Sequence, residues 1–251
     1  MKKLTLLILA LLCAVPLASC NAESVVLDEV KTYEVMSDIH SLNIQINAAD
    51  FMIKHAEEFS VESNLKHLSV SEKDGVLTVV DQAKGNAAYA DAIFILYVPN
   101  DVAFDQVKLV TGAAKLTAVP LSADSMELKL GAGDASFDSL NATSRIDMKG
   151  GAGQITVVGG TLNNLTLEMG VGELNLTAAL LGNNELSLGV GESNVTLLGS
   201  KEDYKVEIEK GIGSITVDGE NVSNFDVIGN GKSHVEISGG IGAINLSFQA
   251  E

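Results

Sequence analysis

Several residue types that often build a bulky core or a basic binding site are scarce in this sequence. Of its 251 residues only 4% are aromatic, Trp is absent and Pro occurs three times. In contrast, 46% of the residues are hydrophobic and 24 are Gly. Such a chain is long enough to bury a core. Its composition favours tight turns and small, regular β-type packing over a bulky helical core.

Arginine occurs once, as Arg145, and the formal net charge is -17. A nucleic-acid-binding protein needs a basic surface to neutralise phosphates, so we expect no nucleic-acid partner. Flat docking on an anionic lipid surface is disfavoured for the same reason. The simplest reading of the acidity is that it keeps the protein soluble.

Long hydrophobic runs are also lacking, apart from a 12-residue apolar run, residues 4–15, behind Lys2 and Lys3. This run is too short to span a bilayer comfortably and has the length of a signal-peptide core. It ends in Leu17-Ala18-Ser19-Cys20, which resembles the lipobox of bacterial lipoproteins. We therefore expect a signal peptide over residues 1–19, lipid attachment at Cys20, and an anchor with a short linker over residues 20–34. The alternative is an ordinary secretory signal with a coincidental Cys.

Cysteine is the remaining scarcity, with two in the chain. Only Cys20 would survive signal removal, so the mature chain would have no intramolecular disulfide and would depend on packing alone. The acyl chains would hold the protein at a membrane, outside the cytoplasm, without spanning the bilayer. Asn21 after the Cys leaves open which side of the envelope the protein faces.

Against these scarcities, one element recurs through the chain. Gly-x-Gly starts at residues 131, 151, 170, 189, 211 and 240, with spacings of 20, 19, 19, 22 and 29. Degenerate copies are Gly112-Ala113-Ala114 and Asn47-Ala48-Ala49. Apolar and polar residues alternate on both sides of each copy, as in "MELKL" before and "QITVV" after, which is the period of half-buried strands.

Each unit therefore predicts a strand, a glycine corner, a second strand and a turn. Stacked units bury a continuous apolar column that one unit cannot bury alone, and we expect the residue between the glycines to point inward. A flat antiparallel meander is the rival, but it gives no reason for the regular spacing. We expect a longer loop at residues 218–234 and a last coil that caps the C-terminal end.

The first part of the domain, residues 35–100, is less repetitive. "LNIQINAADFMIKH" fits a first coil, Asp74-Gly75 predicts a hairpin, and "AIFILYVPND" predicts a buried strand that stops at Pro99. We expect residues 35–100 to form the N-terminal cap and first coils. Residues 101–251 would hold the Gly-x-Gly repeats of the same continuous domain, 35–251.

The strand ending in Val98-Pro99-Asn100, then "VKLVTGAAKL" and "MELKLGAGDASFDSL", resembles the putative-adhesin family of bacterial envelope proteins. Its domains are described as β-strand-repeat, or GIN-type auto-transporter adhesin heads. The resemblance covers roughly residues 35–250. It implies an all-β, single-stranded, right-handed β-helix, with about 19–22 residues per repeat here, and no set of catalytic residues.

Candidates for chemistry on this scaffold are few. After the second glycine, Glu173 and Glu192 would face each other if the coils are in register, and a Ca²⁺ ion would suit two such carboxylates; a solvated acidic face is the alternative. A lyase would draw on Arg145 with Asp147 and Asp134.

The histidines have no metal-ligand spacing; they are His40, His55, His67 and His234. Asn-x-Ser/Thr recurs with the repeat and suggests strand and turn residues rather than glycan acceptors.

We therefore expect a non-catalytic protein of the cell envelope, without metal or cofactor, anchored in a membrane by lipid. It would present a binding or scaffolding surface to an unknown protein or glycan, as an adhesin or an envelope-stress accessory. A carbohydrate-active β-helix enzyme, lyase or hydrolase, is the alternative.

Overall fold

The computed structural model describes residues 27–83, 91–209, 211–222 and 227–250; the signal segment and Cys20 lie outside them. The described residues form an all-β fold, as expected, with a single short 3-10 turn, η1 (Lys201–Asp203). The strands are β1 (Lys31–Glu34), β2 (Ser41–Ile46), β3 (Asp50–Ala56), β4 (Ser60–Ser63), β5 (Leu68–Lys73), β6 (Val76–Asp81), β7 (Ile93–Pro99), β8 (Ala103–Ala113), β9 (Lys115–Ala118), β10 (Leu121–Phe137), β11 (Leu140–Val157), β12 (Gly160–Asn163), β13 (Leu165–Leu181), β14 (Asn183–Leu198), β15 (Tyr204–Glu209), β16 (Ile212–Val217), β17 (Glu220–Asn221), β18 (Val227–Ile228) and β19 (Ser233–Gln249). In this part of the chain there is no helix with the length and apolarity to cross a membrane.

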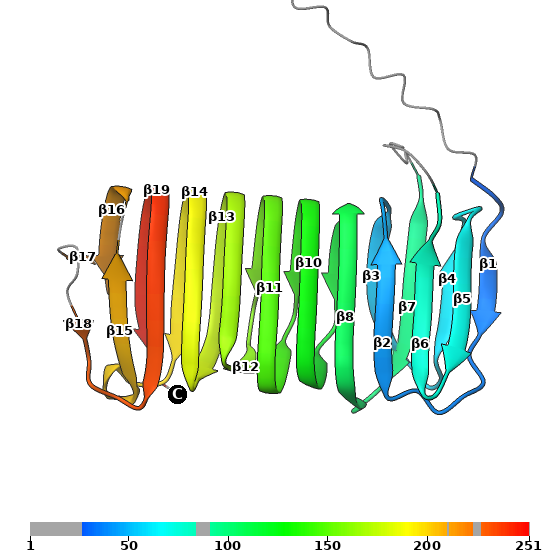
Figure 1. The fold of residues 1–251 in the computed structure, drawn as a ribbon, viewed down its shortest axis with the longest axis horizontal. Coiled ribbons are helices and arrows are strands. Elements are labelled where there is room, and N and C mark those ends of the chain that lie inside the picture. The colour runs from blue at the N-terminus through cyan, green and yellow to red at the C-terminus, as the bar shows by residue number, and fades with distance from the viewer. Residues whose placement is uncertain (1–26, 84–90, 210, 223–226, 251) are drawn as a thin grey trace, which may run out of the picture.

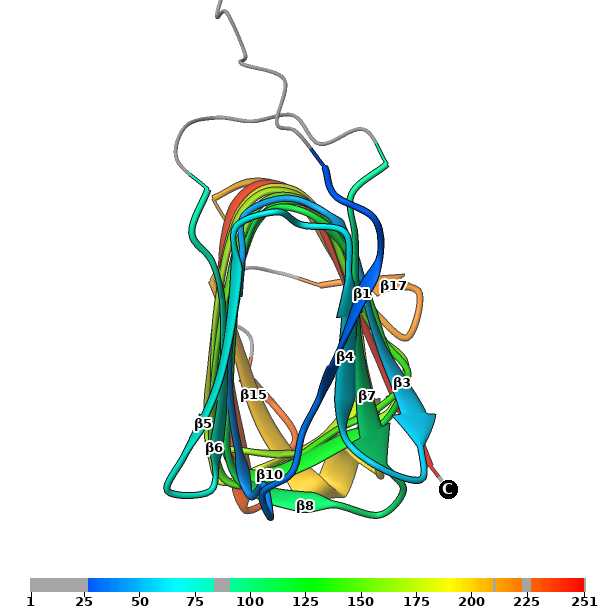
Figure 2. The same ribbon diagram turned by 90° about the vertical axis from the view of Figure 1, so that its right-hand side faces the viewer.

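The central strands are long because each turns a corner without a break in pairing. β10, β11, β13 and β14 pair in parallel, in that order. Each runs along one face of the molecule, bends at its Gly-x-Gly element and returns along the other face (Figures 1 and 2). We call the segments before the glycines the front sheet, those after them the back sheet, and the bend the arch.

The register aligns equivalent residues of successive units. Met126 pairs with Ile146, and Ile146 with Leu165. In the next inward row every side chain is at most 2% exposed; the row is Leu128, Met148, Leu167, Leu186, Ile237 and Ile208. Each coil thus covers the apolar edge of its neighbour, which is how the alternating pattern of the sequence becomes one continuous core.

Close backbone contact explains why the corner needs glycine. Gly191 has φ 145°, a conformation that L side chains rarely adopt, and a Cβ there would lie 1.7 Å from the carbonyl oxygen of Gly172. The residue between the glycines points outward, so the inward expectation is wrong: Val171 and Val190 are 55% and 47% exposed. The inner side of so tight a bend is already filled by Met169 and Leu188, which are buried.

At the N-terminal end the spatial order of the coils differs from their order in the sequence. The coil of β2 and β3 lies between the coil of β6 and β7 and the coil of β8 and β9. Antiparallel β5 and β4 cover the outer edges of β6 and β7, and β1 covers β4. The hairpin at Asp74-Gly75 is confirmed, with φ 50° and 72°. β1 falls within the stretch 20–34 that the sequence assigns to the anchor and linker.

A second inversion occurs at the C-terminal end. β19 pairs with β14 on one side and with β15 and β16 on the other. The expectation that the last coil caps the stack is therefore wrong: β15 and β16 form the outermost coil, edged by the two-residue strands β18 and β17. The longer spacing before Gly240 gives the chain the length to run outward, turn and insert its last coil behind the previous one.

Candidate functional site

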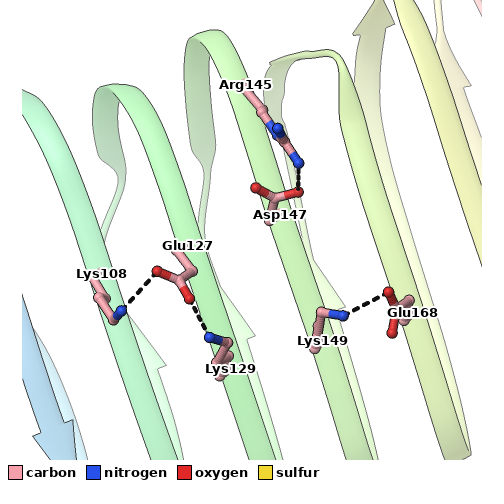
Figure 3. A network of polar contacts seen from close by, with 7 residues as sticks. All are labelled: Lys108, Glu127, Lys129, Arg145, Asp147, Lys149 and Glu168. Atoms are coloured by element: carbon pink, nitrogen blue, oxygen red, sulfur yellow. Dashed lines mark hydrogen bonds and ion pairs between the residues drawn. The ribbon is translucent and has the colours of Figure 1, made fainter.

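An ion-pair network lies on the outer surface of the front sheet (Figure 3). Glu127 on β10 accepts from Lys108 on β8 at 2.9 Å and from Lys129 on its own strand. The hydrogen bond from Lys129, followed by that from Lys108, holds the pKa of the Glu127 carboxyl below its usual value. Further along, Lys149 on β11 pairs with Glu168 on β13 at 2.7 Å. These side chains are exposed or half-buried, so each pair contributes little to stability.

The residues proposed for a lyase are only partly brought together. Arg145 donates to Asp147 at 2.6 Å across one residue of the same strand (Figure 3). Asp134 lies beyond its corner, on the back sheet, where it pairs in register with Gln154. Arg145 and Asp147 therefore form an exposed surface pair, and Asp134 belongs to the opposite sheet.

Charge is unevenly distributed along the front sheet. In the C-terminal half Glu185, Glu236 and Glu207 are direct neighbours on successive strands. Lys205 pairs with Glu207 at 2.5 Å and lowers its pKa, whereas no ion pair holds Glu185 or Glu236 among the described residues. An open depression lies beside this row, between Glu185 and the arch. The polar residues that line the depression are Thr166, Glu168, Glu185, Ser187 and Ser238. Like charges on adjacent strands repel, so this end is suited to a cationic or hydrogen-bonding partner.

The back sheet carries a ladder of amide side chains. Asn194 donates to Asn175 at 3.0 Å, Asn245 donates to Asn194 at 2.9 Å, and Thr216 donates to Asn245 at 2.8 Å. Asn175, Asn194 and Asn245 belong to the recurring Asn-x-Ser/Thr pattern, and their hydrogen bonds give the pattern a structural role. Such ladders link neighbouring strands through their side chains as well as their backbones.

Glu173 and Glu192 face each other in register, as the repeat predicted. Their carboxylates already accept amide protons, Glu173 from Asn175 at 2.7 Å and Glu192 from Asn245 at 3.2 Å. Across the described ranges no three His, Cys, Asp or Glu side chains are grouped so as to hold a metal ion. The histidines are dispersed, and His40 pairs with Asp105 at 2.8 Å.

Where the surroundings shift a carboxyl pKa in the described residues, the shift is downward. Hydrogen-bond donors cause it in each case; the residues are Asp28, Glu72, Asp124, Glu127, Asp203 and Glu207. A glycosidase needs one carboxyl with a raised pKa to protonate the leaving group. These six groups are therefore stabilised as carboxylates, the opposite of what a general acid requires.

One exposed apolar row was not predicted. It runs along the top of the arch and consists of the residues between the paired glycines and their first equivalent; we call it the crest. In spatial order it is Ala113, Ala132, Ala152, Val171, Val190, Ile241 and Ile212. Ile241 is 53% and Ile212 73% exposed. The signal was present in the sequence, because the middle residue of Gly-x-Gly changes from Ala to Val to Ile along the chain.

Comparison with known proteins gives a family match and several distant structures. The family described as Toastrack DUF4097 matches residues 31–247. A putative cell adhesion protein from Clostridium sporogenes is 18% identical, with 88% of this chain and 99% of that chain covered and a TM-score of 0.41. A putative adhesin from Parabacteroides merdae is 14% identical, with 86% and 95% covered and a TM-score of 0.41. No curated protein matches.

Proposed function

This chain belongs to the Toastrack DUF4097 family, and on that premise we propose that it is a non-catalytic, lipid-anchored protein of the cell envelope. Its coils form a right-handed β-helix with about 19–22 residues per repeat. The helix presents an extended surface for binding or scaffolding, as an adhesin does or as an accessory of envelope-stress sensing. The partner is a protein or a glycan.

The observation that carries this proposal is the regularity of the front sheet. Side chains from successive coils stand in straight rows, with one residue about every 4.8 Å along the stack. Ion pairs fill the N-terminal half of these rows, and the row of Glu185, Glu236 and Glu207 fills the C-terminal half. A rigid, repeating, polar array suits an extended partner that is contacted at many points.

The arrangement of the acidic groups favours binding over catalysis. Glu127 is held as a carboxylate between two lysines, and Arg145 is engaged with Asp147 on an exposed strand. The depression beside Glu168 and Glu185 is open, so water has access to both carboxylates. Catalysis of glycoside cleavage depends on a carboxyl shielded from water to raise its pKa.

Anchoring depends on Cys20 in this proposal. We expect Cys20→Ala to move the protein from the membrane fraction to the soluble fraction, because the diacylglyceryl group is the hydrophobic attachment. Fractionation of cells followed by immunoblotting measures this distribution. Cys13→Ala is the matched control, since Cys13 lies within the signal peptide, and it should leave the protein in the membrane. Membrane retention of Cys20→Ala equal to that of Cys13→Ala would contradict the anchor.

A further inference from the structure

We propose that the crest lies against the lipid bilayer that holds the anchor, so that the stack lies on its arch with its long axis parallel to the membrane. This inference rests on the proposed lipid anchor at Cys20. It adds a second, apolar contact and an orientation, with the front and back sheets standing away from the bilayer.

The crest has the chemistry of a surface that contacts lipid. Val171, Val190, Ile241 and Ile212 stand side by side on adjacent strands, each about half exposed or more. Branched aliphatic side chains that face solvent in a continuous row mark a surface that is covered in use. Four strands about 4.8 Å apart give this row a length of about 15 Å.

Beside Val171 and Val190 the charged side chains that follow the corner are directed away from the crest. Glu173 and Glu192 follow the second glycine of their corners, but both bond to asparagines further down the back sheet. On the front side, Met169 and Leu188 precede the first glycine and are buried. At these two corners the crest is thus an apolar ridge that reaches a flat surface before Glu173 and Glu192 do.

The chain enters the fold on the same side as the crest. The backbone N–H of Asp28 donates to the carbonyl of Asn64 at 2.9 Å, and the side chain of Asn64 accepts from the N–H of Ile93 at 2.8 Å. Ile93 pairs with Asp50, which directly follows the corner Asn47-Ala48-Ala49. The chain therefore enters the fold at the level of the arch, as Figure 2 shows. Cys20 precedes Asp28 by eight residues, which span at most about 29 Å when extended.

The N-terminal entry of the chain and the Val and Ile residues of the crest lie toward opposite ends of the arch side of the stack. β1 is at the N-terminal edge, and the strands between it and Val171 are β4, β7, β3, β9, β10 and β11. Seven strand spacings separate β1 from Val171 by about 34 Å. An anchor at one end and an apolar ridge at the other can meet one bilayer only if the stack lies lengthwise on its arch.

A bilayer fits the crest better than a second copy of the chain does. Two copies joined at the arch would bring two acidic chains together, because the full sequence has a formal net charge of -17. Zwitterionic lipid adds no such repulsion, and apolar insertion beside an acyl anchor supplies the second signal that strengthens attachment. The occupant we propose is therefore a zwitterionic lipid surface.

The test uses the full lipidated chain with single substitutions Val190→Cys and Val158→Cys. Val158 is a matched control: it is 59% exposed and follows the last residue of β11, at the end of the back sheet away from the arch. Each variant is labelled with the fluorophore NBD and reconstituted in phosphatidylcholine vesicles with or without nitroxide-labelled lipid. Far-ultraviolet circular dichroism checks that both variants keep the β fold, and a second crest variant, Ile241→Cys, repeats the measurement.

We expect nitroxide lipid to quench the label at positions 190 and 241 at least about five-fold more than at 158, because only the crest enters the bilayer. Equal quenching at all three positions in protein that floats with the vesicles would overturn the crest contact and leave the anchor standing. Protein that fails to float would overturn the anchor and the orientation together. A label at 190 shielded from aqueous iodide but not quenched by lipid would place a protein, including a second copy, on the crest and overturn the proposal.

Discussion

Gly191→Ala is expected to lower the free energy of unfolding by about 3–5 kcal/mol. The φ of 145° is strained for alanine, and the added Cβ would lie 1.7 Å from the carbonyl oxygen of Gly172. That oxygen belongs to the backbone of the neighbouring coil, so it can move away only if the parallel pairing of β13 and β14 is disturbed. Urea denaturation followed by circular dichroism measures the loss.

Two other glycines separate the causes of this effect. Gly219 has φ 82°, and a Cβ there would meet nothing within 4 Å, so Gly219→Ala should cost only the backbone strain, about 1–2 kcal/mol. Gly159 has no positive φ, and its nearest neighbour would be 3.8 Å away, so Gly159→Ala should be nearly neutral. If Gly191→Ala lost no more stability than Gly219→Ala, close contact between coils would not be the reason for glycine at the corner.

The inverted order of the last coils is expected to give a nearly all-or-none pattern of disulfide cross-linking. Thr196 on β14 and Ser247 on β19 have their hydroxyl oxygens 3.0 Å apart, so Thr196→Cys with Ser247→Cys should be joined in most molecules after mild oxidation. Mass spectrometry of the linked peptides measures the yield and distinguishes these bonds from any that involve Cys20.

The matched pair is Asn194→Cys with Thr216→Cys. Both residues are register neighbours of Asn245, on opposite sides of β19. They are therefore two strand spacings apart, about 9.6 Å, beyond the reach of a disulfide. In a stack that followed sequence order these two positions would be adjacent. Efficient linkage of Asn194 to Thr216, with none between Thr196 and Ser247, would refute the inversion.

Local features of the fold could be predicted from the sequence because local chemistry determines them. Asp74-Gly75 marks a hairpin because both residues accept positive φ. Glu173 and Glu192 are neighbours because the spacing of 19 residues is the distance around one coil. The all-β character follows from the alternation of apolar and polar residues on both sides of each corner.

Two features could not be predicted, for different reasons. A period fixes which residues are equivalent, but it does not fix the order in which equivalent coils stack; the insertion of β19 beside β14 depends on the return path from β16. Alternation predicts the facing of side chains in straight strands only. At the arch three successive residues, 190–192, are exposed, so Val190 faces outward where simple alternation from Leu188 would place it inside.

The most direct test of the account measures polysaccharide cleavage and polysaccharide binding by this protein in the same samples. Cleavage is detected as new chain ends. The detergent-solubilised protein would be incubated with a panel of envelope and host polysaccharides in the presence of Ca²⁺, and reducing ends, unsaturated ends and retained protein would be measured. A non-catalytic surface predicts that no new polysaccharide chain ends form. Protein retained on a polysaccharide would identify a glycan partner. If no polysaccharide retains the protein, the partner is a protein. New ends that disappear in Arg145→Ala or Glu168→Gln would contradict the account and establish a carbohydrate-active enzyme.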